Sequence, residues 1–238
     1  MQDTIIIDEK FCGYLNIGNG GYVCGMIANH IFSTTAKVTL WKPPPVNIPI
    51  DVVRIQNKVL LKNNDIIIAE GQSSSIDIDK IPSPPSFEEA VEASKLSFAL
   101  SDNAPSPDCF VCGCNRNEDN GLRVFAGPVY NKNMVAAPFV PSPSLFDNSG
   151  NIRSEFLWAV LDCPGAYSFV EKQMPLMVLG RLVASVTKDI KPYEKCVVIG
   201  WQISTKGKKL FSGSALFSSS GELYGISKAT WLPMKIQS

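Results

Sequence analysis

The sequence has a single histidine among its 238 residues, and this scarcity excludes several kinds of site. A metal centre that needs two or more imidazoles cannot form within one chain. His30 itself lies among apolar residues late in a helical pattern, so we expect a hydrogen-bonded core histidine rather than a general base. No Gly-x-Ser-x-Gly segment occurs, which argues against a hydrolase built around a nucleophile elbow.

The sequence also has no excess of either charge and no long hydrophobic run. Its 22 basic and 22 acidic residues give a formal net charge of zero, which argues against a nucleic-acid-binding protein. No stretch approaches the roughly 20 apolar residues of a membrane span, and residues 1–10 lack the features of a signal peptide. Seven cysteines cannot all pair within one chain, so we expect reduced thiols in a cytoplasmic protein.

What the sequence does contain is one plan of helix and strands that occurs twice. Apolar helical stretches are expected at residues 20–32 and at residues 153–169, where Pro164 interrupts the second. Each is followed by a strand, a proline-containing loop, a strand, a turn and a further strand. The expected strands are 38–41, 51–56, 58–61, 66–71, 122–125, 134–137, 181–186, 196–203, 210–217 and 223–232. We infer a duplicated α+β unit.

Between the two copies the composition changes. Residues 79–86 contain three prolines, and Ser86 with Glu89 forms a capping-box pattern that predicts a helix over 87–100. Residues 101–120 are polar and read as a loop with clustered cysteines. We therefore expect an N-terminal unit at 1–80, a linker with a short helix and a Cys-rich loop at 81–120, and a C-terminal unit at 121–238.

Both expected helices lack a charged face. Residues 23–32 contain no formally charged side chain, apart from whatever charge His30 carries. A surface helix would show a polar stripe, whereas a helix wrapped by a curved sheet needs none. The predicted architecture is therefore a central helix wrapped by an antiparallel sheet in each half.

Two incomplete motifs lie at the ends of these helices. Asn19, Gly20 and Gly21 open the first helix, where bare backbone N–H groups are available to a developing oxyanion. The glycines also suit close packing, and Asn19 is a good N-cap whether or not it contacts substrate. Asp162 ends the second helix among apolar neighbours, where a carboxylate is costly without a partner or a function. The alternative interpretation is that Asp162 is a helix-end residue whose carboxylate is hydrogen-bonded to the backbone.

These residues carry a resemblance to the thioesterase-like hotdog superfamily, over nearly the whole chain. In the phenylacetyl-CoA and 4-hydroxybenzoyl-CoA thioesterase-like branch, His-Gly-Gly opens the central helix and an acidic residue follows about two turns later. Here Asn19 replaces that histidine before Gly20-Gly21, and the acid position of this helix holds Ala28. In the second helix Asp162 occupies the acid position, but Arg153-Ser154-Glu155 replaces the glycine motif.

The resemblance implies a tandem double hotdog with one composite site. Asn19, Gly20 and Gly21 would face Asp162, and the second combination, Arg153-Ser154-Glu155 with Ala28, would be inactive. Asp162 would activate water as a general base or attack the thioester itself, Gly20 and Gly21 would bind the oxyanion, and Asn19 would orient the substrate. A hotdog hydratase is disfavoured, because it needs an Asp and a His near the helix start.

The type II acyl-CoA thioesterases, which are also double hotdogs, offer a second comparison. The segment 40–43 (Leu-Trp-Lys-Pro) and the helix start resemble their first half. Their water-binding set of Asp, Thr or Ser, and Gln has no clear match, because those positions fall near Arg181 and Ala229.

Further side chains are candidates for contacts with substrate. These are Tyr22, Arg181, Lys208, Lys209 and Thr230. Lys208 and Lys209 form an expected hairpin tip, which is either simply solvated or contacts the phosphates of coenzyme A. Thr230 and Trp231 are candidates for the acyl channel, although alternation does not say which of them faces it.

Cys109, Cys112 and Cys114 form a dense cysteine group. One Cys-x-x-Cys is half of a zinc site, but no second pair with suitable spacing follows, so we expect no metal. No cofactor is expected beyond coenzyme A as part of the substrate.

We therefore expect an acyl-CoA thioesterase-like hydrolase. The alternative is a non-catalytic protein of the same fold that binds acyl-CoA or a lipid-like ligand. The expected partner is an acyl-CoA or related thioester, with no nucleic acid and no membrane span, and assembly into a homo-oligomer is left open.

Overall fold

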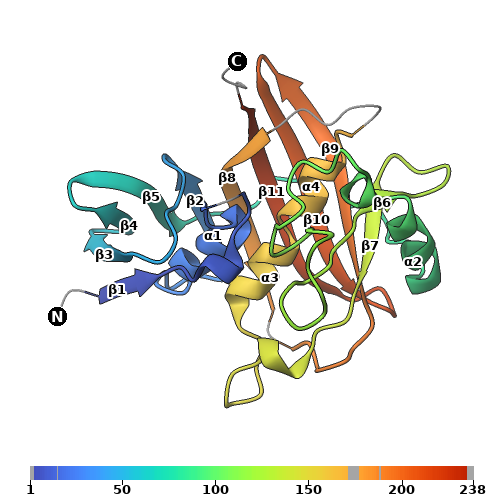
Figure 1. The fold of residues 1–238 in the computed structure, drawn as a ribbon, viewed down its shortest axis with the longest axis horizontal. Helices are drawn as coiled ribbons and strands as arrows, with labels where there is room; N and C mark the ends of the chain where they lie inside the picture. Colours follow the sequence, from blue (N-terminus) through green and yellow to red (C-terminus); the bar gives the residue numbers. More distant parts are fainter. Residues whose placement is uncertain (1–2, 15, 171–176, 188, 235–238) are drawn as a thin grey trace.

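Two short helices at the centre of the molecule come from opposite halves of the chain. The computed structural model describes residues 3–14, 16–170, 177–187 and 189–234. Helix α1 (Gly20–Ala28) packs directly on α3 (Ser154–Val160), and Figure 1 shows both against one large sheet. The prediction of two apolar central helices is confirmed, and both are shorter than expected.

The sheet is antiparallel throughout and has eleven strands in the described part of the chain, in the order β1-β3-β4-β5-β2-β8-β11-β10-β9-β7-β6. The strands of the first half are β1 (Asp3–Ile6), β2 (Thr35–Leu40), β3 (Pro49–Ile55), β4 (Lys58–Asn63) and β5 (Ile66–Ser73). Those of the second half are β6 (Gly127–Pro128), β7 (Val135–Phe139), β8 (Met177–Val186), β9 (Cys196–Lys206), β10 (Lys209–Ser218) and β11 (Leu223–Pro233).

The two halves join at one strand pair, β2 with β8. Val38 lies opposite Leu182 in this pair, and both side chains are fully buried. The order of strands therefore keeps each half together and fuses the two halves edge to edge. This seam brings the two central helices side by side.

The helices meet through glycine. A Cβ on Gly21 would lie 2.5 Å from the Cβ of Asp162, and one on Gly25 would lie 2.5 Å from the Cα of Glu155. Both distances are far below van der Waals contact, so only glycine allows this approach. The face of α1 that packs on the core is apolar, with Val23, Cys24 and Ile27 fully buried, as its lack of charge predicted.

The second helical stretch breaks at the site of the candidate acid. Helix α3 ends at Val160, and α4 (Cys163–Tyr167) starts immediately after Asp162. Pro164 lies in the first turn of α4, a position that needs no backbone N–H. The interruption predicted at Pro164 is therefore a change of helix, with Asp162 at the junction.

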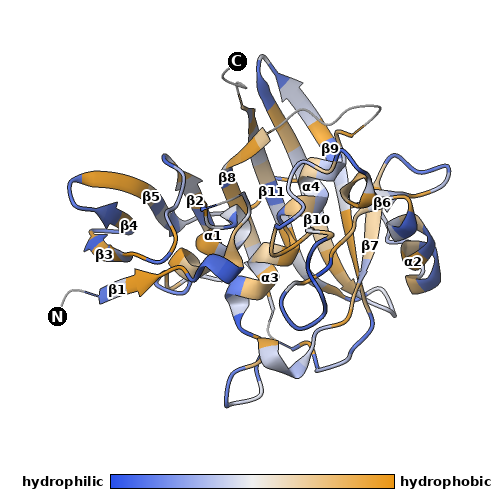
Figure 2. Cartoon of the chain, in the orientation of Figure 1, coloured by the Kyte–Doolittle hydropathy of each residue, from blue (hydrophilic) through white to orange (hydrophobic). Residues whose placement is uncertain are grey.

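Helix α2 (Phe87–Lys95) covers the β6–β7 end of the sheet. Its predicted capping box is confirmed, because Ser86 Oγ accepts from Glu89 N and Glu89 Oε2 accepts from Ser86 N. The prediction of one helix to residue 100 was too long, since the segment ends in a separate 3-10 turn (Phe98–Leu100). Figure 2 shows the mixed hydropathy of α2, which lies beside β6 and β7.

Three strand assignments differ from the sequence prediction. Residues 122–125, of which Val124 and Phe125 are buried, form no strand, and the two-residue strand β6 was missed. Strand β1 was missed, because it is an edge strand with little burial and no alternation for the pattern to reveal. No described helix is long and apolar enough to cross a membrane.

Candidate active site

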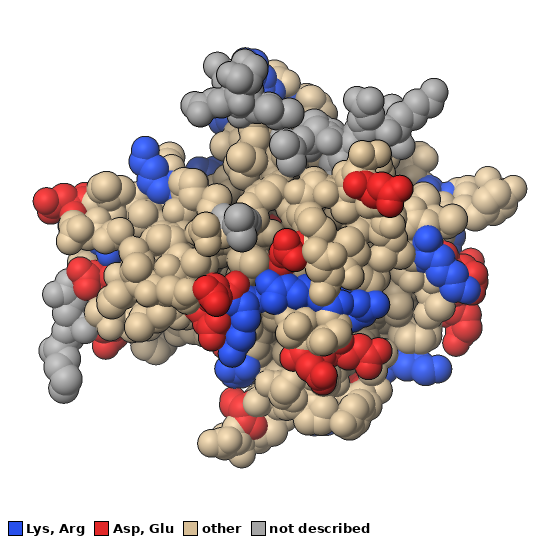
Figure 3. All heavy atoms as spheres, viewed as in Figure 1, with Lys and Arg blue, Asp and Glu red and all other residues tan. Residues whose placement is uncertain are grey.

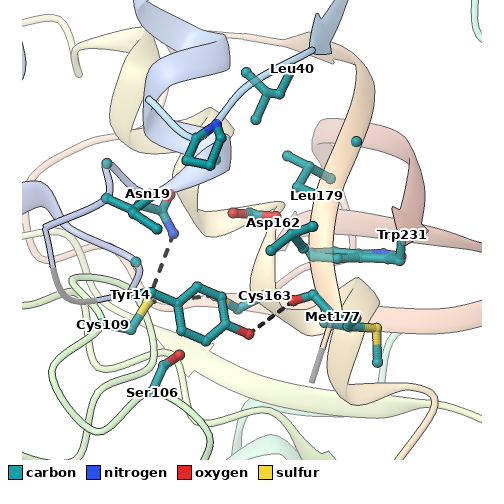
Figure 4. Close-up of a pocket in the computed structure, with 18 of the residues that line it drawn as sticks. Tyr14, Asn19, Leu40, Ser106, Cys109, Asp162, Cys163, Met177, Leu179 and Trp231 are labelled. Carbon is teal, nitrogen blue, oxygen red and sulfur yellow. Dashed lines mark hydrogen bonds between the residues drawn. The ribbon is translucent and has the colours of Figure 1, made fainter. Parts of the chain in front are cut away.

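One cavity of about 240 Å³ takes its walls from both halves of the chain. The N-terminus of α1 contributes Asn19 and Gly20, and the junction of α3 with α4 contributes Asp162. The remaining walls are largely apolar and include Leu40 and Trp41 from the end of β2 and Leu179 of β8. Figure 4 shows the carboxylate of Asp162 among these side chains, with Asn19 on one side and Trp231 on the other.

Asp162 is held by one oxygen and presents the other. Its Oδ2 accepts a hydrogen bond of 2.8 Å from the backbone N of Gly21, across the contact between the two central helices. Its Oδ1 is buried and has no hydrogen-bond partner among the described residues. A buried carboxylate oxygen without a partner is costly, so the arrangement favours a role for this oxygen.

The protein surroundings of Asp162 raise the pKa of its carboxyl group above the ordinary value. Burial raises the pKa of Asp162 to about 7, against the opposing effects of the hydrogen bond from the Gly21 N–H and of the nearby Asn19 amide. The negative charge of a Cys109 thiolate adds to the increase in this pKa. A carboxyl group with a pKa near neutrality can both take up and return a proton in one reaction cycle.

Asn19 is the N-cap of α1, which confirms one of its two predicted roles; the other was contact with substrate. Its Oδ1 accepts from the backbone N of Tyr22 at 2.9 Å, and its Nδ2 lies 3.8 Å from the sulfur of Cys109. The backbone N–H of Gly20 makes no hydrogen bond within the described part of the chain. This N–H lies at the positive end of α1 beside the cavity.

The two glycines therefore differ, which the sequence could not reveal. The prediction gave both N–H groups to an oxyanion, but that of Gly21 is bonded to Asp162. Only the N–H of Gly20 is left for a ligand. The packing role considered for the pair is real as well, because a Cβ on Gly20 would lie 2.9 Å from Leu179 Cδ2.

Four of the other predicted contacts lie outside the cavity walls. Tyr22 is 5% exposed and stacks on Phe11 with ring centroids 4.3 Å apart, so it is a core residue. Arg181 is exposed and its Nε donates to Thr39 Oγ1 at 3.0 Å. Lys208 and Lys209 lie at the exposed β9–β10 hairpin. None of these residues lines the cavity.

On β11 both Trp231 and Leu232 line the cavity, and Thr230 does not. The regular register of β11 against β8 is interrupted between Thr230 and Trp231. The indole Nε1 of Trp231 donates to Ser212 Oγ at 2.9 Å, which fixes the ring against the cavity. The prediction for Thr230 is corrected accordingly.

Sequence reasoning missed several cavity residues. Tyr14 lies in the wall, and its hydroxyl donates to the backbone oxygen of Met177 at 2.9 Å, which is drawn in Figure 4. Burial raises the pKa of Tyr14 to about 12, so it stays neutral and can only donate or accept a hydrogen bond. No motif marked Tyr14, because it precedes the helix in an irregular loop. Trp41 and Lys42, exposed at the end of β2, also line the cavity.

His30 lies away from this cavity, as expected for a histidine without a catalytic role. It is half-buried rather than part of the core, and its Nδ1 lies 3.0 Å from Nη2 of Arg54. Burial, with a smaller contribution from the Arg54 charge, lowers the pKa of His30.

The opposite junction of the two central helices has a different chemistry. There the end of α1 meets the start of α3, and Asn29 Nδ2 donates to Glu155 Oε2 at 3.1 Å. Ser154 Oγ also donates to Asn29 Oδ1. The residue that meets the start of α3 is Asn29 rather than Ala28, one position later than counting along the sequence indicated. The side chains at this junction hydrogen-bond to each other. Among the described residues, neither carboxylate oxygen of Glu155 is a buried atom without a hydrogen-bond partner.

Charges elsewhere on the viewed surface are mixed. Figure 3 shows basic and acidic side chains interspersed over one face of the molecule, in keeping with a net charge of zero. On that face the basic side chains gather in a short band near the centre, with acidic side chains on either side of it.

The fold resembles solved structures over nearly its full length. A conserved protein of unknown function with a hot dog fold from Alicyclobacillus acidocaldarius superposes with a TM-score of 0.60, at 9% identity, over 98% of this chain and 93% of that one. An acyl-CoA thioesterase II from Mycobacterium marinum gives 0.57 at 11% identity, over 98% and 93% of the two chains. The tesB protein of Mycobacterium avium subsp. paratuberculosis gives 0.58 at 11% identity, over 92% and 88%.

No family model matches the sequence, and no curated protein matches it significantly. At identities this low the likeness establishes the fold alone. The expected resemblance is confirmed at that level, and the chain has the hot dog fold.

Proposed function

We propose that this protein hydrolyses an acyl-CoA or a similar thioester, with Asp162 as the general base. The observation that carries the proposal is that the two oxygens of this carboxylate have different surroundings. Oδ2 is fixed by the Gly21 N–H of the other helix, while Oδ1 is buried at an apolar cavity without a partner among the described residues. The thioesterase names of structures with the same fold support the reaction class.

In the proposed reaction, Asp162 takes a proton from a water molecule as the water oxygen bonds to the thioester carbonyl carbon. The carbonyl oxygen becomes an oxyanion and accepts a hydrogen bond from the Gly20 N–H, aided by the dipole of α1. The intermediate then expels the thiolate, and the proton held by Asp162 passes to the departing sulfur. The products are a carboxylic acid and a free thiol. Direct attack by the carboxylate, through an anhydride, is the second route.

We further propose that the two halves are tandem hotdog units at 1–80 and 121–238, with 81–120 as the linker. The helix and the strands of each half match this division, and the β2–β8 pair is the seam between the units. In this arrangement one unit supplies the helix N-terminus and the other the carboxylate. Each chain then holds one site.

The β9–β10 hairpin is the proposed contact for the phosphates of coenzyme A. Leu210, next to Lys209, pairs with Trp231, which lines the cavity, so the basic tip adjoins the cavity end of β11. Replacing both Lys208 and Lys209 by Ala should raise KM for an acyl-CoA about 3–10-fold, because each exposed charge contributes up to about 1 kcal/mol. The KM for the same acyl group on N-acetylcysteamine, which has no phosphate, should not change.

Lys132→Ala, in the turn between β6 and β7, is the matched control for the lysine variant. Added salt should weaken acyl-CoA binding by the wild type more than by the double variant. Equal KM changes for the two thioesters would remove the hairpin from phosphate binding.

The rival function is a non-catalytic binding protein with the same cavity. The test is release of coenzyme A from a panel of short, long and aromatic acyl-CoA thioesters, combined with mass spectrometry of the denatured purified protein. A hydrolase should release thiol from at least one member and carry no intact thioester. Absence of release across the panel, with an intact acyl-CoA bound to the purified protein, would favour the binder.

A further inference from the structure

Three thiols from distant parts of the chain meet beside the candidate site. Cys109 and Cys112 belong to the loop that precedes β6, and Cys163 is the first residue of α4. Their sulfur atoms all lie within 4.8 Å of one another, and those of Cys109 and Cys163 are 4.0 Å apart. All three residues are buried. The fold therefore supplies the third thiol that the spacing along the sequence lacked.

The loop is shaped so that its two cysteines point the same way. The backbone N of Gly113 donates to the carbonyl oxygen of Cys109 at 2.8 Å, which closes a tight turn over the Cys-x-x-Cys segment. A Cβ on Gly113 would lie 2.5 Å from that same oxygen and 2.6 Å from the Cys109 nitrogen. The turn thus requires glycine directly after the second cysteine.

Hydrogen-bond donors surround the sulfur atoms. Asn19 Nδ2 lies 3.8 Å from the sulfur of Cys109, and the Tyr167 hydroxyl donates to the sulfur of Cys112 at 3.6 Å. Donors of this kind stabilise thiolates and fix metal ligands in place.

We propose that Cys109, Cys112 and Cys163 bind one Zn²⁺ ion through their thiolates, with a fourth coordination position that faces the cavity. Zinc–sulfur bonds of about 2.3 Å in a tetrahedral site separate the sulfurs by about 3.8 Å, so the 4.0 Å pair needs almost no movement. All three residues line the cavity, which gives a water molecule access to the fourth position.

A zinc ion explains features that other uses of the thiols do not. A disulfide between Cys109 and Cys163 would need the sulfurs to close from 4.0 Å to about 2 Å and would leave Cys112 unpaired. Simple apolar packing would not need donors aimed at the sulfurs. Three thiolates and Zn²⁺ together carry a single negative charge, which the Asn19 and Tyr167 donors are placed to offset.

The site would join the loop to the turn that carries the candidate base. Cys163 directly follows Asp162, and among the described residues no backbone hydrogen bond joins the loop to α4. Bound zinc would therefore fix the junction of α3 with α4. This role is independent of whether any thioester is hydrolysed.

The test is the metal content of the full chain, purified under reducing conditions from cells supplied with zinc. Elemental analysis by mass spectrometry should find about one zinc ion per chain. Cys109→Ser and Cys163→Ser should each lower the bound zinc at least about tenfold. Cys114→Ser, two residues beyond Cys112 in the same loop, should retain it, because its sulfur is outside the cluster.

Cobalt binding by the wild-type protein tests the proposal without depending on whether the variants fold. Co²⁺ added to wild-type protein depleted of metal should produce intense sulfur-to-cobalt charge-transfer absorption, and one equivalent of Zn²⁺ should abolish it. Wild type that binds neither ion, equal zinc loss in Cys114→Ser, or a Cys109–Cys163 disulfide in freshly purified protein would each overturn the proposal. Because no substrate is involved, these outcomes are separate from the test of the proposed function.

Discussion

Asp162→Asn should lower turnover of the best acyl-CoA substrate by about 100-fold or more, the effect of losing a general base. The amide has nearly the same shape and its oxygen can still accept the Gly21 N–H bond that Oδ2 accepts now. It cannot take a proton from water at the position of Oδ1. The measurement is kcat from coenzyme A release under saturating substrate, with KM expected to change little because the cavity walls stay in place.

Glu155→Gln is the matched control for this variant. Glu155 is a carboxylate at the other junction of the same two helices, where its Oε2 accepts from Asn29. Its replacement should leave kcat close to that of the wild type. Similar turnover by Asp162→Asn and the wild type, or an equal loss in both variants, would remove Asp162 from the chemistry.

Gly25→Ala should destabilise the protein by about 1–3 kcal/mol, the range for overpacking a filled core. The added Cβ would lie 2.5 Å from the Cα of Glu155 and 2.9 Å from the Cβ of Trp158. The first of these is a backbone atom that no rotamer change can move, so the helices must separate. In a helix Ala is intrinsically favoured over Gly by about 1 kcal/mol, and the overlap has to outweigh this gain. The measurement is the midpoint of urea unfolding at unchanged slope.

Gly225→Ala provides the control for the helix contact. A Cβ at this β11 position would lie 3.2 Å from side-chain carbons of Leu161 and Val186, and 3.6 Å, an ordinary contact distance, from the backbone oxygen of Ser185. Those side chains can shift by a few tenths of an ångström, so the unfolding midpoint should move much less. A Gly25→Ala protein as stable as the wild type would mean that the two helices are less tightly packed than their distances indicate.

The parts of the fold that were predictable are those where pattern and burial agree. Two apolar helices without a charged face could only be central, and the pairing of the α1 start with Asp162 followed from the complementary gaps in two motifs. The capping box at Ser86 and Glu89 was equally readable, because it is a local hydrogen-bond pattern. Edge strand β1 was not, since its exposed residues carry no alternation.

The unpredicted parts of the site depend on contacts between distant segments. That Gly21 rather than Gly20 bonds to Asp162 depends on the angle at which the two helices cross, which no local pattern encodes. The position of Tyr22 in the aromatic core, instead of the cavity, has the same origin. Cys163 lies 54 residues from Cys109, so spacing rules for metal ligands had no means to connect them.

The polar junction formed by Asn29, Ser154 and Glu155 bears on how this sequence can change over evolutionary time. At one end of the helix pair Asp162 has an unpartnered oxygen at a cavity, while at the other end Asn29, Ser154 and Glu155 hydrogen-bond to each other across the two halves. Substitutions at the second end are limited by the stability of the fold, because they remove bonds that join the halves. Under the proposed function, substitutions of Asp162 are limited by the chemistry of the cavity. The two ends of one helix pair therefore tolerate sequence change for different reasons.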